Sequence, residues 1–407
     1  MTHIDALWGF LVAGVVAFVM APVAARLARS IGAIDMPRER GLSDGPTPRL
    51  GGLAILAGVA AAGLLFLPLT GDSEVAEQTR GIALGALVAA LVGTADDIWD
   101  LHAGLKLIGQ AAAALIPVLA GVRVETFTLP FLGHVDLAGA SGPVTMVGIV
   151  AVMNVVNFTD GVDGLAAGVC TIAAGTLAII ALSLDKACLD GSATCTGAGV
   201  LAAITAGASF GFLYHNFHPA SIFMGDAGAN LLGLLLACVA IQGTIKTAAI
   251  VALFFPLAVL AVPILDGAFV VMKRIKYGRP VYKADRWHLH HRLANIGFSQ
   301  RRTVLYLYGW TLALAALALA LRFLPYSDDH GHFHAGWSIV LACFGVLALG
   351  ASLYLVYVLE ILKFTRFRRR ELMRETGEDV SDDEIERQVR GEVETGEWEV
   401  PDHVGGV

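Results

Sequence analysis

The sequence predicts an all-α polytopic integral membrane protein with about eleven transmembrane helices. Of its 407 residues, 56% are hydrophobic and 15% are charged, and the mean hydropathy is +0.69. Soluble globular domains are more polar than this. The hydrophobic residues form long stretches, and the segments between them hold most of the charges. No nucleic-acid-binding pattern is present, because the basic residues follow membrane topology instead.

Eleven apolar stretches mark the expected helices, and most approach the roughly 20 residues needed to cross the hydrocarbon. Two of them, Val144–Val156 and Ala229–Gln242, are short, and we expect their inner ends to open into a polar pocket. The others are Leu7–Ala28, Gly51–Leu69, Gly81–Ala95, Leu107–Gly121, Leu165–Leu184, Gly199–Phe217, Thr247–Met272, Val304–Leu324 and Trp337–Leu362.

The basic residues orient the chain in the membrane. If the N-terminus lies outside, 23 of the 28 Lys and Arg residues fall on the cytoplasmic side, as the positive-inside rule requires. The sequence therefore predicts a multi-pass protein of the inner (plasma) membrane with a cytoplasmic C-terminus. The residues left on the other side are Arg80, Arg123, Lys186, Lys246 and Arg322.

Two regions follow from this topology, a transmembrane domain over residues 1–363 and a cytoplasmic tail over residues 364–407. The tail begins with basic residues, which we expect to meet anionic lipid head groups. Residues 371–407 then carry 13 acidic residues against three arginines, so the tail is predicted to be mostly disordered. Cys188 and Cys195 share one outer loop, and the sequence is equally compatible with a disulfide between them and with two free thiols.

An acidic pair follows the span that ends at Ala95. Carboxylates at the edge of a bilayer usually mark a metal, proton or substrate site. Asp96 and Asp97 point about 100° apart on a helix. One is therefore expected to hold a cation or orient a base, and the other to accept a proton. The alternative is a solvated helix end paired with Lys106.

The segment over residues 154–164 is more specific. Two asparagines share one helix face, and two glycines then allow a turn from which two aspartates present oxygens. Such oxygens suit Mg²⁺, which prefers few protein ligands together with waters and substrate phosphates. The residues are Asn154, Asn157, Asp160, Gly161, Asp163 and Gly164.

A third cluster precedes the span at Ala229. Asp226 follows Phe223, whose ring offers a face for stacking a base, and Asn216 lies just upstream. The helix that begins here favours anions at its N-terminus. Simple capping of that helix by Asp226 is the alternative.

The last cluster lies in the longest internal cytoplasmic loop. Its histidines lack the H-E-x-x-H geometry of zinc enzymes. With arginines on both sides, they indicate recognition of an anionic pyrophosphate. The residues are His288, His290, His291 and Arg292.

These segments together resemble the polyprenyl-phosphate N-acetylhexosamine-1-phosphate transferase family. The resemblance covers roughly residues 1–305. His288-Leu289-His290-His291 is similar to the motif of the GlcNAc-1-phosphate branch rather than the phospho-MurNAc-pentapeptide branch. The other matching motifs are Pro46-Thr47-Pro48-Arg49-Leu50-Gly51-Gly52, Asp96-Asp97 with Lys106 and Gln110, and Phe223-Met224-Gly225-Asp226-Ala227-Gly228.

The resemblance implies a reaction and a set of partners. A UDP-N-acetylhexosamine would give its sugar-1-phosphate to a membrane polyprenyl phosphate and release UMP, with Mg²⁺ or alternatively Mn²⁺ as cofactor. Membrane lipids are the expected surroundings, and a homodimer is a further expectation because dimers occur in the family. GlcNAc is the favoured sugar, with MurNAc-pentapeptide or a bacillosamine-type sugar as alternatives.

The resemblance also implies residue roles. Asp226 and Asn157 would bind the metal, with Asp160 nearby. Asp96 or Asp97 would orient or deprotonate the lipid phosphate, which Lys106 would neutralise. Substrate would further contact Asn154, the uridine-site residues Gly161, Asp163, Asn216 and Phe223, and the pyrophosphate- or sugar-site residues His288, His290, His291 and Arg292.

Two other functional classes fit poorly. An intramembrane aspartyl protease needs a G-x-G-D motif, and this chain has Phe223 where the first glycine belongs. An ion-coupled transporter should carry mid-span acids on both halves of a repeat. Here the acids gather at cytoplasmic helix ends, and no repeat is visible.

Overall fold

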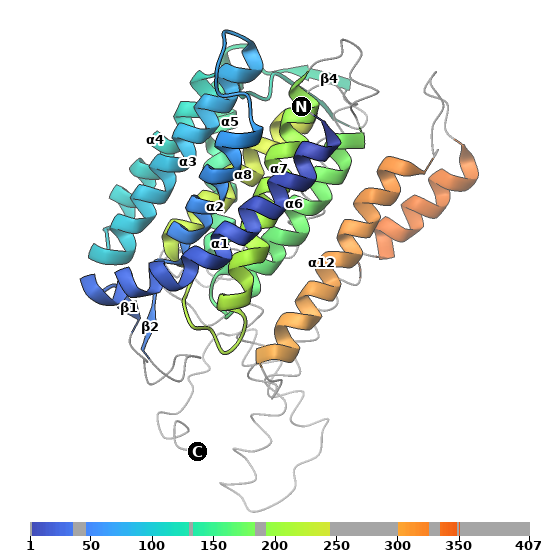
Figure 1. Cartoon of the computed structure of the whole chain (residues 1–407). Coiled ribbons are helices and arrows are strands. Elements are labelled where there is room, and N and C mark those ends of the chain that lie inside the picture. The colour runs from blue at the N-terminus through green and yellow to red at the C-terminus, as the bar shows by residue number, and fades with distance from the viewer. Residues whose placement is uncertain are drawn as a thin grey trace, which may run out of the picture.

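The computed structural model describes residues 2–35, 46–129, 133–183, 193–244, 300–324, 334–347 and 350. These residues form a bundle of long helices with two small antiparallel sheets, β1–β2 and β3–β4 (Figure 1). The elements are α1 (His3–Ile31), β1 (Ile34–Asp35), β2 (Thr47–Pro48), α2 (Gly51–Phe66), α3 (Glu74–Trp99), α4 (Ala103–Leu119), β3 (Thr126–Leu129), β4 (Gly133–Asp136), η1 (Ala138–Ala140), α5 (Ser141–Thr159), α6 (Leu165–Ser183), α7 (Ala193–Asn216), α8 (Gly225–Thr244) and α12 (Gln300–Phe323). A further helix covers Ala335–Leu347.

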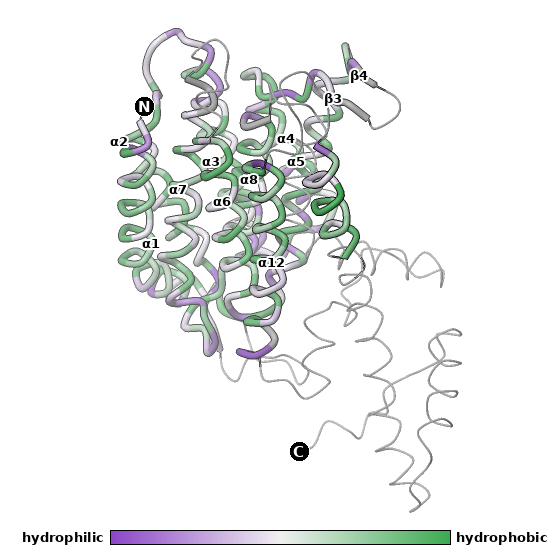
Figure 2. Tube along the Cα trace, turned by 90° about the vertical axis from the view of Figure 1, so that its right-hand side faces the viewer, coloured by the Kyte–Doolittle hydropathy of each residue, from purple (hydrophilic) through white to green (hydrophobic). Residues whose placement is uncertain are grey.

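The prediction of an all-α membrane protein is confirmed. Within the described ranges, seven helices are long and apolar enough to cross a membrane, and α2 and α4 are shorter apolar helices. Hydrophobic residues dominate these helices in Figure 2. The predicted spans up to Ala229–Gln242, and Val304–Leu324, fall on helices. Thr247–Met272 and the end of Trp337–Leu362 lie outside the described residues, so the total of eleven and the orientation stay predictions.

The two short apolar stretches, Val144–Val156 and Ala229–Gln242, lie within longer helices. α5 begins at Ser141 and runs to Thr159, and α8 begins at Gly225. Both helices are longer than their apolar stretches because the polar residues at their ends are helical too. Asn154, Asn157 and Asp226 therefore lie on regular helix turns, where the spacing of residues fixes which ones share a face.

Small residues bring the backbones of α1 and α7 into contact. A Cβ atom added at Gly207 would lie 2.1 Å from the Phe10 carbonyl oxygen, and one at Gly211 would lie 2.0 Å from the Gly14 oxygen. Membrane helices commonly associate through such surfaces, because lipid gives no hydrophobic force between them. Other positions of α1 expose large apolar side chains such as Leu7 and Val15, which suits contact with lipid tails.

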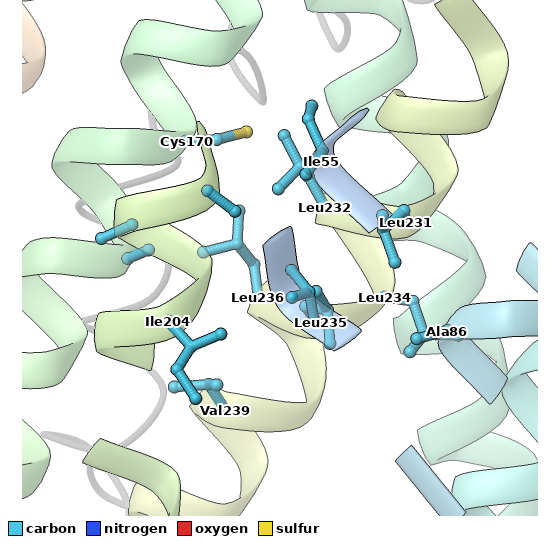
Figure 3. Packing of buried hydrophobic residues seen from close by; sticks show 14 of the residues in the cluster. Ile55, Ala86, Cys170, Ile204, Leu231, Leu232, Leu234, Leu235, Leu236 and Val239 are labelled. Atoms are coloured by element: carbon cyan, nitrogen blue, oxygen red, sulfur yellow. The ribbon is translucent and has the colours of Figure 1, made fainter. Parts of the chain in front are cut away.

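The central helix is α8, which is surrounded by its neighbours. Its leucines at 231, 232, 234, 235 and 236 are at most 1% exposed although they point in different directions. Figure 3 places Ile55 of α2, Ala86 of α3, Cys170 of α6 and Ile204 of α7 around it. The start of α8, which carries Asp226, is therefore anchored to several helices.

Helix directions gather the candidate site residues at one end of the bundle. α3, α5 and α7 end where α4, α6 and α8 begin, and the β1–β2 sheet lies at this same end (Figure 1). The β3–β4 hairpin lies at the opposite end. We call the end with β1–β2 the polar end; it holds residues 96–106, 157–164 and 216–226.

The cysteines take no part in the polar end. Cys170 and Cys238 are buried free thiols, and Cys343 is exposed. Cys188 lies outside the described residues, so the disulfide with Cys195 stays a prediction.

Candidate active site

Asp97 of α3 caps the first turn of α8. Its two carboxylate oxygens accept hydrogen bonds from the backbone N–H groups of Asp226, at 2.9 Å, and Ala227, at 3.1 Å. Unpaired N–H groups at a helix start attract a negative charge. The backbone of Asp226 is thus held by Asp97 of α3, so the Asp226 side chain does not need to cap α8 itself.

Gly225 is required at this junction. It has φ +70°, a left-handed conformation that glycine adopts without strain. A Cβ atom there would lie 2.4 Å from the Arg49 carbonyl oxygen and 2.5 Å from Asp97 Oδ2. The Met224-Gly225-Asp226 sequence is therefore fixed by backbone geometry as well as by chemistry.

The segment before α2 supports this turn from the other side. The N–H groups of Gly51 and Gly52 donate to the carbonyl oxygens of Phe223, at 2.9 Å, and Met224, at 2.8 Å. The Phe223 N–H donates to the Pro48 oxygen at 2.8 Å. The Pro46–Gly52 motif is thus a backbone cradle for the Phe223–Asp226 turn, a role that sequence reasoning did not assign.

Lys106 of α4 joins two of the predicted acids. Its ammonium lies 2.9 Å from Asp96 Oδ2 and also forms an ion pair with Asp226. The Asp96 carboxylate accepts a further hydrogen bond from the Leu101 N–H at 2.9 Å. The side chains of Asp96, Lys106 and Asp226 are 10–20% exposed. One cation is thus shared between α3, α4 and α8 at a partly shielded position.

The turn after α5 is tied to the loop after α7. Asn216 is 1% exposed, and its Oδ1 accepts from the Gly164 N–H at 3.1 Å while its Nδ2 donates to the Ile222 oxygen at 3.0 Å. Asn216 therefore holds two loops together, and its predicted contact with uridine stays a prediction.

A second link between these loops comes from Asp163. Its Oδ2 lies 2.9 Å from Nδ1 of His218 and accepts the Ala220 N–H at 3.1 Å. α12 contacts the same region, since Arg301 donates to the His218 carbonyl oxygen and Tyr308 to that of Gly164. His218 is a site residue that the sequence analysis left without a role.

Asp160 lies within the electrostatic reach of the other acids. Burial raises the pKa of its carboxyl well above the usual range, and the carboxylates of Asp226 and Asp97 raise it further. A hydrogen bond from the Gly225 N–H opposes this shift. The carboxyl groups gathered at the polar end therefore disfavour one another's ionised forms.

This donor set fits a hard divalent cation in its chemistry. Mg²⁺ takes oxygen ligands and often uses one or two carboxylates, with waters and substrate phosphates completing the shell. No three His, Cys, Asp or Glu side chains in the described part of the chain could jointly hold a metal. The Asp226 carboxylate and the Asn157 amide at the end of α5 are oxygen donors of the required kind.

Asn154 lies one turn deeper on α5 and contacts an amide network rather than the charged residues. Its Nδ2 donates to Gln110 Oε1 at 2.9 Å, and Gln110 Nε2 donates to Asn230 Oδ1 at 2.9 Å. Within the described residues, Asn230 Nδ2 is buried without a partner, an arrangement that costs about 1–3 kcal/mol. From the sequence, Gln110 was identified only as part of a matching motif and Asn230 was not identified, although a polar amide within an apolar span was the signal for both.

The remaining predicted residues are placed as follows. Phe223 is half-buried and Gly161 is exposed on its turn. Asp96, Asp97, Lys106, Asp160 and Asp226 come together at the polar end, as expected. The histidine motif with His288, His290, His291 and Arg292 lies outside the described residues.

Comparison with known proteins identifies the relatives of this chain. Residues 79–244 match the model of glycosyl transferase family 4. The chain is 35% identical over 315 residues to a probable undecaprenyl-phosphate N-acetylglucosaminyl 1-phosphate transferase of Bacillus subtilis (strain 168), covering 76% of this chain and 84% of the relative.

Two further relatives illustrate the breadth of the match. A decaprenyl-phosphate N-acetylglucosaminephosphotransferase of Mycobacterium tuberculosis (strain ATCC 25618 / H37Rv) is 37% identical over 329 residues, 75% of this chain and 79% of the relative. A phospho-N-acetylmuramoyl-pentapeptide-transferase of Desulforudis audaxviator (strain MP104C) is 34% identical over 316 residues, 69% of this chain and 89% of the relative.

Proposed function

Because this chain belongs to glycosyl transferase family 4, as a polyprenyl-phosphate N-acetylhexosamine-1-phosphate transferase, we propose that it transfers GlcNAc-1-phosphate from UDP-GlcNAc to a polyprenyl phosphate. UMP is the second product. The observation that carries this proposal is the meeting of Asp96, Lys106 and Asp226 at one end of the bundle. Relatives that are named for GlcNAc transfer support the choice of sugar.

The reaction exchanges one phosphoanhydride bond for another. An oxygen of the lipid phosphate attacks the β-phosphorus of UDP-GlcNAc, and the bond from that phosphorus to the bridging oxygen breaks. The electron pair leaves with UMP. Little covalent chemistry falls to the protein, so its work is positioning and charge stabilisation.

The two acids of the Asp96-Asp97 pair divide their work on this proposal. Both oxygens of Asp97 receive N–H groups of α8, so Asp97 acts as a positioning residue for Asp226. Asp96 faces Lys106, and this pair meets the lipid phosphate. The Lys106 ammonium offsets the charge of that phosphate, and Asp96 orients the ammonium or takes a proton from the acceptor.

The nucleotide binds beside this pair, over the two linked loops. Phe223 supplies a ring for stacking on uracil, and Gly161 lets the backbone approach. Asp163 directs one carboxylate oxygen toward His218 and Ala220 and offers the other to the base. Asn154 and the histidine motif retain their predicted contacts with substrate.

A divalent cation, Mg²⁺ or alternatively Mn²⁺, would be held by Asp226 and Asn157 and would supply positive charge at the pyrophosphate. Asp160 stands near enough to Asp226 for the two carboxyl groups to interact electrostatically, and a bound cation would favour the ionised form of both. The polar end faces the cytoplasm of the plasma membrane on this proposal, because the Lys and Arg residues concentrate in the segments assigned to that side.

An assay of the full chain in lipid nanodiscs tests the proposal. With UDP-GlcNAc, polyprenyl phosphate and Mg²⁺, UMP and lipid-linked GlcNAc should appear in equal amounts, and a chelator should stop both. UMP without the lipid product would indicate hydrolysis. Faster reaction with UDP-MurNAc-pentapeptide would favour the phospho-MurNAc-pentapeptide transferase activity instead. Inertness toward every UDP-sugar tried would refute the proposal.

A further inference from the structure

Three amide side chains form a chain of hydrogen bonds directly behind the Lys106–Asp226 ion pair. Asn154 of α5 donates to Gln110 of α4, and Gln110 donates to Asn230 of α8, both at 2.9 Å. Gln110 is 1% exposed and Asn230 is fully buried. We call these three residues the amide relay. It connects three helices in a region where apolar side chains would be expected.

The direction of the amide relay is fixed by the backbone. Asn154 Nδ2 also donates to the Val150 carbonyl oxygen at 2.8 Å, and turning this amide over would set two oxygens against each other. Asn154 must therefore donate to Gln110, which in turn must donate to Asn230. Asn230 Nδ2 is therefore the last donor of the relay, and it has no partner among the described residues.

Each member of the amide relay lies one helical turn below a residue of the candidate site. Gln110 follows Lys106 by four positions on α4, and Asn230 follows Asp226 by four positions on α8. Asn154 precedes Asn157 by three on α5. Residues three or four apart share one face of a helix. The relay therefore fixes the relative register of the three helices immediately beneath the charged groups.

We infer that Gln110 and Asn230 are positioning residues of the transfer reaction. They keep the Lys106 ammonium on Asp226 and hold both in register with Asn157. This inference rests on the proposed function. Side-chain hydrogen bonds lock membrane helices that lipid does not push together, and a shift of about 1 Å at reacting groups lowers rates about a hundredfold.

Single variants test the contacts of the amide relay. Gln110→Leu and Asn230→Leu should lower turnover about tenfold or more while the Kd for UMP changes less than about threefold, because the relay supports the groups that meet the reacting phosphates and not the loops that meet the base. At this fully buried position, the carboxyl of Asn230→Asp stays protonated because burial disfavours the charged form. The variant then keeps an acceptor oxygen for Gln110 and exchanges only the unpartnered amide group for an O–H, so it should stay close to wild type. Equal loss in Asn230→Asp and Asn230→Leu would contradict the inference.

Gln242 provides a matched control on the same helix. It is a buried amide of α8 whose Nε2 donates to Gln78 Oε1 of α3 at 2.9 Å, about 18 Å along the helix from Asn230. Gln242→Leu should leave turnover near the wild-type value. A loss as large as that of Asn230→Leu would assign the effect to general packing and overturn the positioning role.

A double-mutant cycle asks whether the amide relay acts through Lys106. Lys106→Met should itself lower turnover strongly, and adding Gln110→Leu should then cost less than about twofold more. Losses that multiply would overturn the inference, as would Leu variants that match wild type. If the wild-type protein transfers nothing, both the proposed function and this inference are refuted. If the wild-type protein is active, the variants test the amide relay alone.

Discussion

Asp96 and Asp97 are neighbours in sequence, but they accept hydrogen bonds from different donors. Asp97 accepts hydrogen bonds from two backbone N–H groups of α8, whereas Asp96 accepts hydrogen bonds from the Lys106 ammonium and the Leu101 N–H. Adjacent positions on a helix diverge by about 100°, which sends one side chain toward α8 and the other toward α4. A difference in mutational behaviour follows from this divergence.

Asp97→Asn should lower both the melting temperature and the turnover. An amide keeps one acceptor oxygen but turns an NH₂ group toward a backbone N–H, leaving a donor unsatisfied at a cost of about 1–3 kcal/mol. Asp96→Asn keeps an acceptor oxygen for the Leu101 N–H and turns its NH₂ group toward the Lys106 ammonium, which keeps Asp226 as its partner. It should therefore lower turnover while the melting temperature falls less than in Asp97→Asn. Thermal unfolding in detergent, measured beside turnover, separates the two. Equal melting temperatures would contradict the capping role of Asp97.

His218 offers a second prediction for a single residue. His218→Ala removes the ring nitrogen that faces Asp163 and should weaken UMP binding about tenfold, which corresponds to 1.4 kcal/mol. His218→Asn places an amide donor near the position of Nδ1 and should recover most of the affinity, whereas His218→Gln should not. Calorimetric titration with UMP gives the comparison. Identical affinities for all three variants would exclude His218 from positioning Asp163.

Among the helices, α2 shows how a small residue can determine the site from outside it. A Cβ atom at Gly52 would lie 2.1 Å from the Gly228 backbone nitrogen and 2.5 Å from the Ala227 carbonyl carbon. Neither backbone atom can move without displacing the start of α8. The glycine therefore sets how closely α2 approaches the helix that carries Asp226.

Gly52→Ala should consequently abolish most turnover and destabilise the protein. Gly63→Ala on the same helix is the control, because a Cβ there meets only Leu67 Cδ1 at 3.6 Å, an ordinary contact. Alanine is also favoured over glycine in a helix interior by about 0.5–1 kcal/mol. Gly63→Ala should therefore be neutral or slightly stabilising. Measuring the melting temperature and the turnover of the two variants tests this prediction. Similar values for both variants would contradict the close approach of α2 to the start of α8 at Gly52.

The sequence predicts helices far better than it predicts contacts between them. Hydropathy located the helices because each span is a continuous local signal, and acidic residues at span ends marked the polar end. The cradle of Gly51 and Gly52 under Phe223 joins segments far apart in sequence, and no local pattern carries such pairing. For the same reason, the partners of Asn216 could not be predicted from the sequence. Its buried amide forms hydrogen bonds with two backbone groups, at Gly164 and Ile222.

At the scale of the whole molecule, the alternating helix directions place the acids and β1–β2 at one end and the hairpin β3–β4 at the other (Figure 1). The charge distribution of the chain then predicts which end faces which compartment. Of the 28 Lys and Arg residues, 23 belong to segments assigned to the side of the polar end. A strong bias of this kind sets the orientation of membrane proteins.

Single cysteines test this orientation in intact cells. Cysteines introduced at Gly133 and Ser327 should react with a membrane-impermeant thiol reagent, whereas cysteines at Arg279 and Glu384 should react only after the membrane is opened. The unsubstituted chain, which has five cysteines, gives the background. The reverse pattern would turn the polar end away from cytoplasmic UDP-sugars and contradict the proposed function.

The cap that α3 places on α8 has a consequence for how the protein is made. α4, α5, α6 and α7 are all synthesised between the two helices. At about 5–20 residues per second, on the order of ten seconds separate them. During that interval Asp97 lacks the N–H groups it will later cap, and Lys106 has only one of its two carboxylates. The cap on α8 and the ion pair between Lys106 and Asp226 can therefore form only after α8, the central helix, has been synthesised.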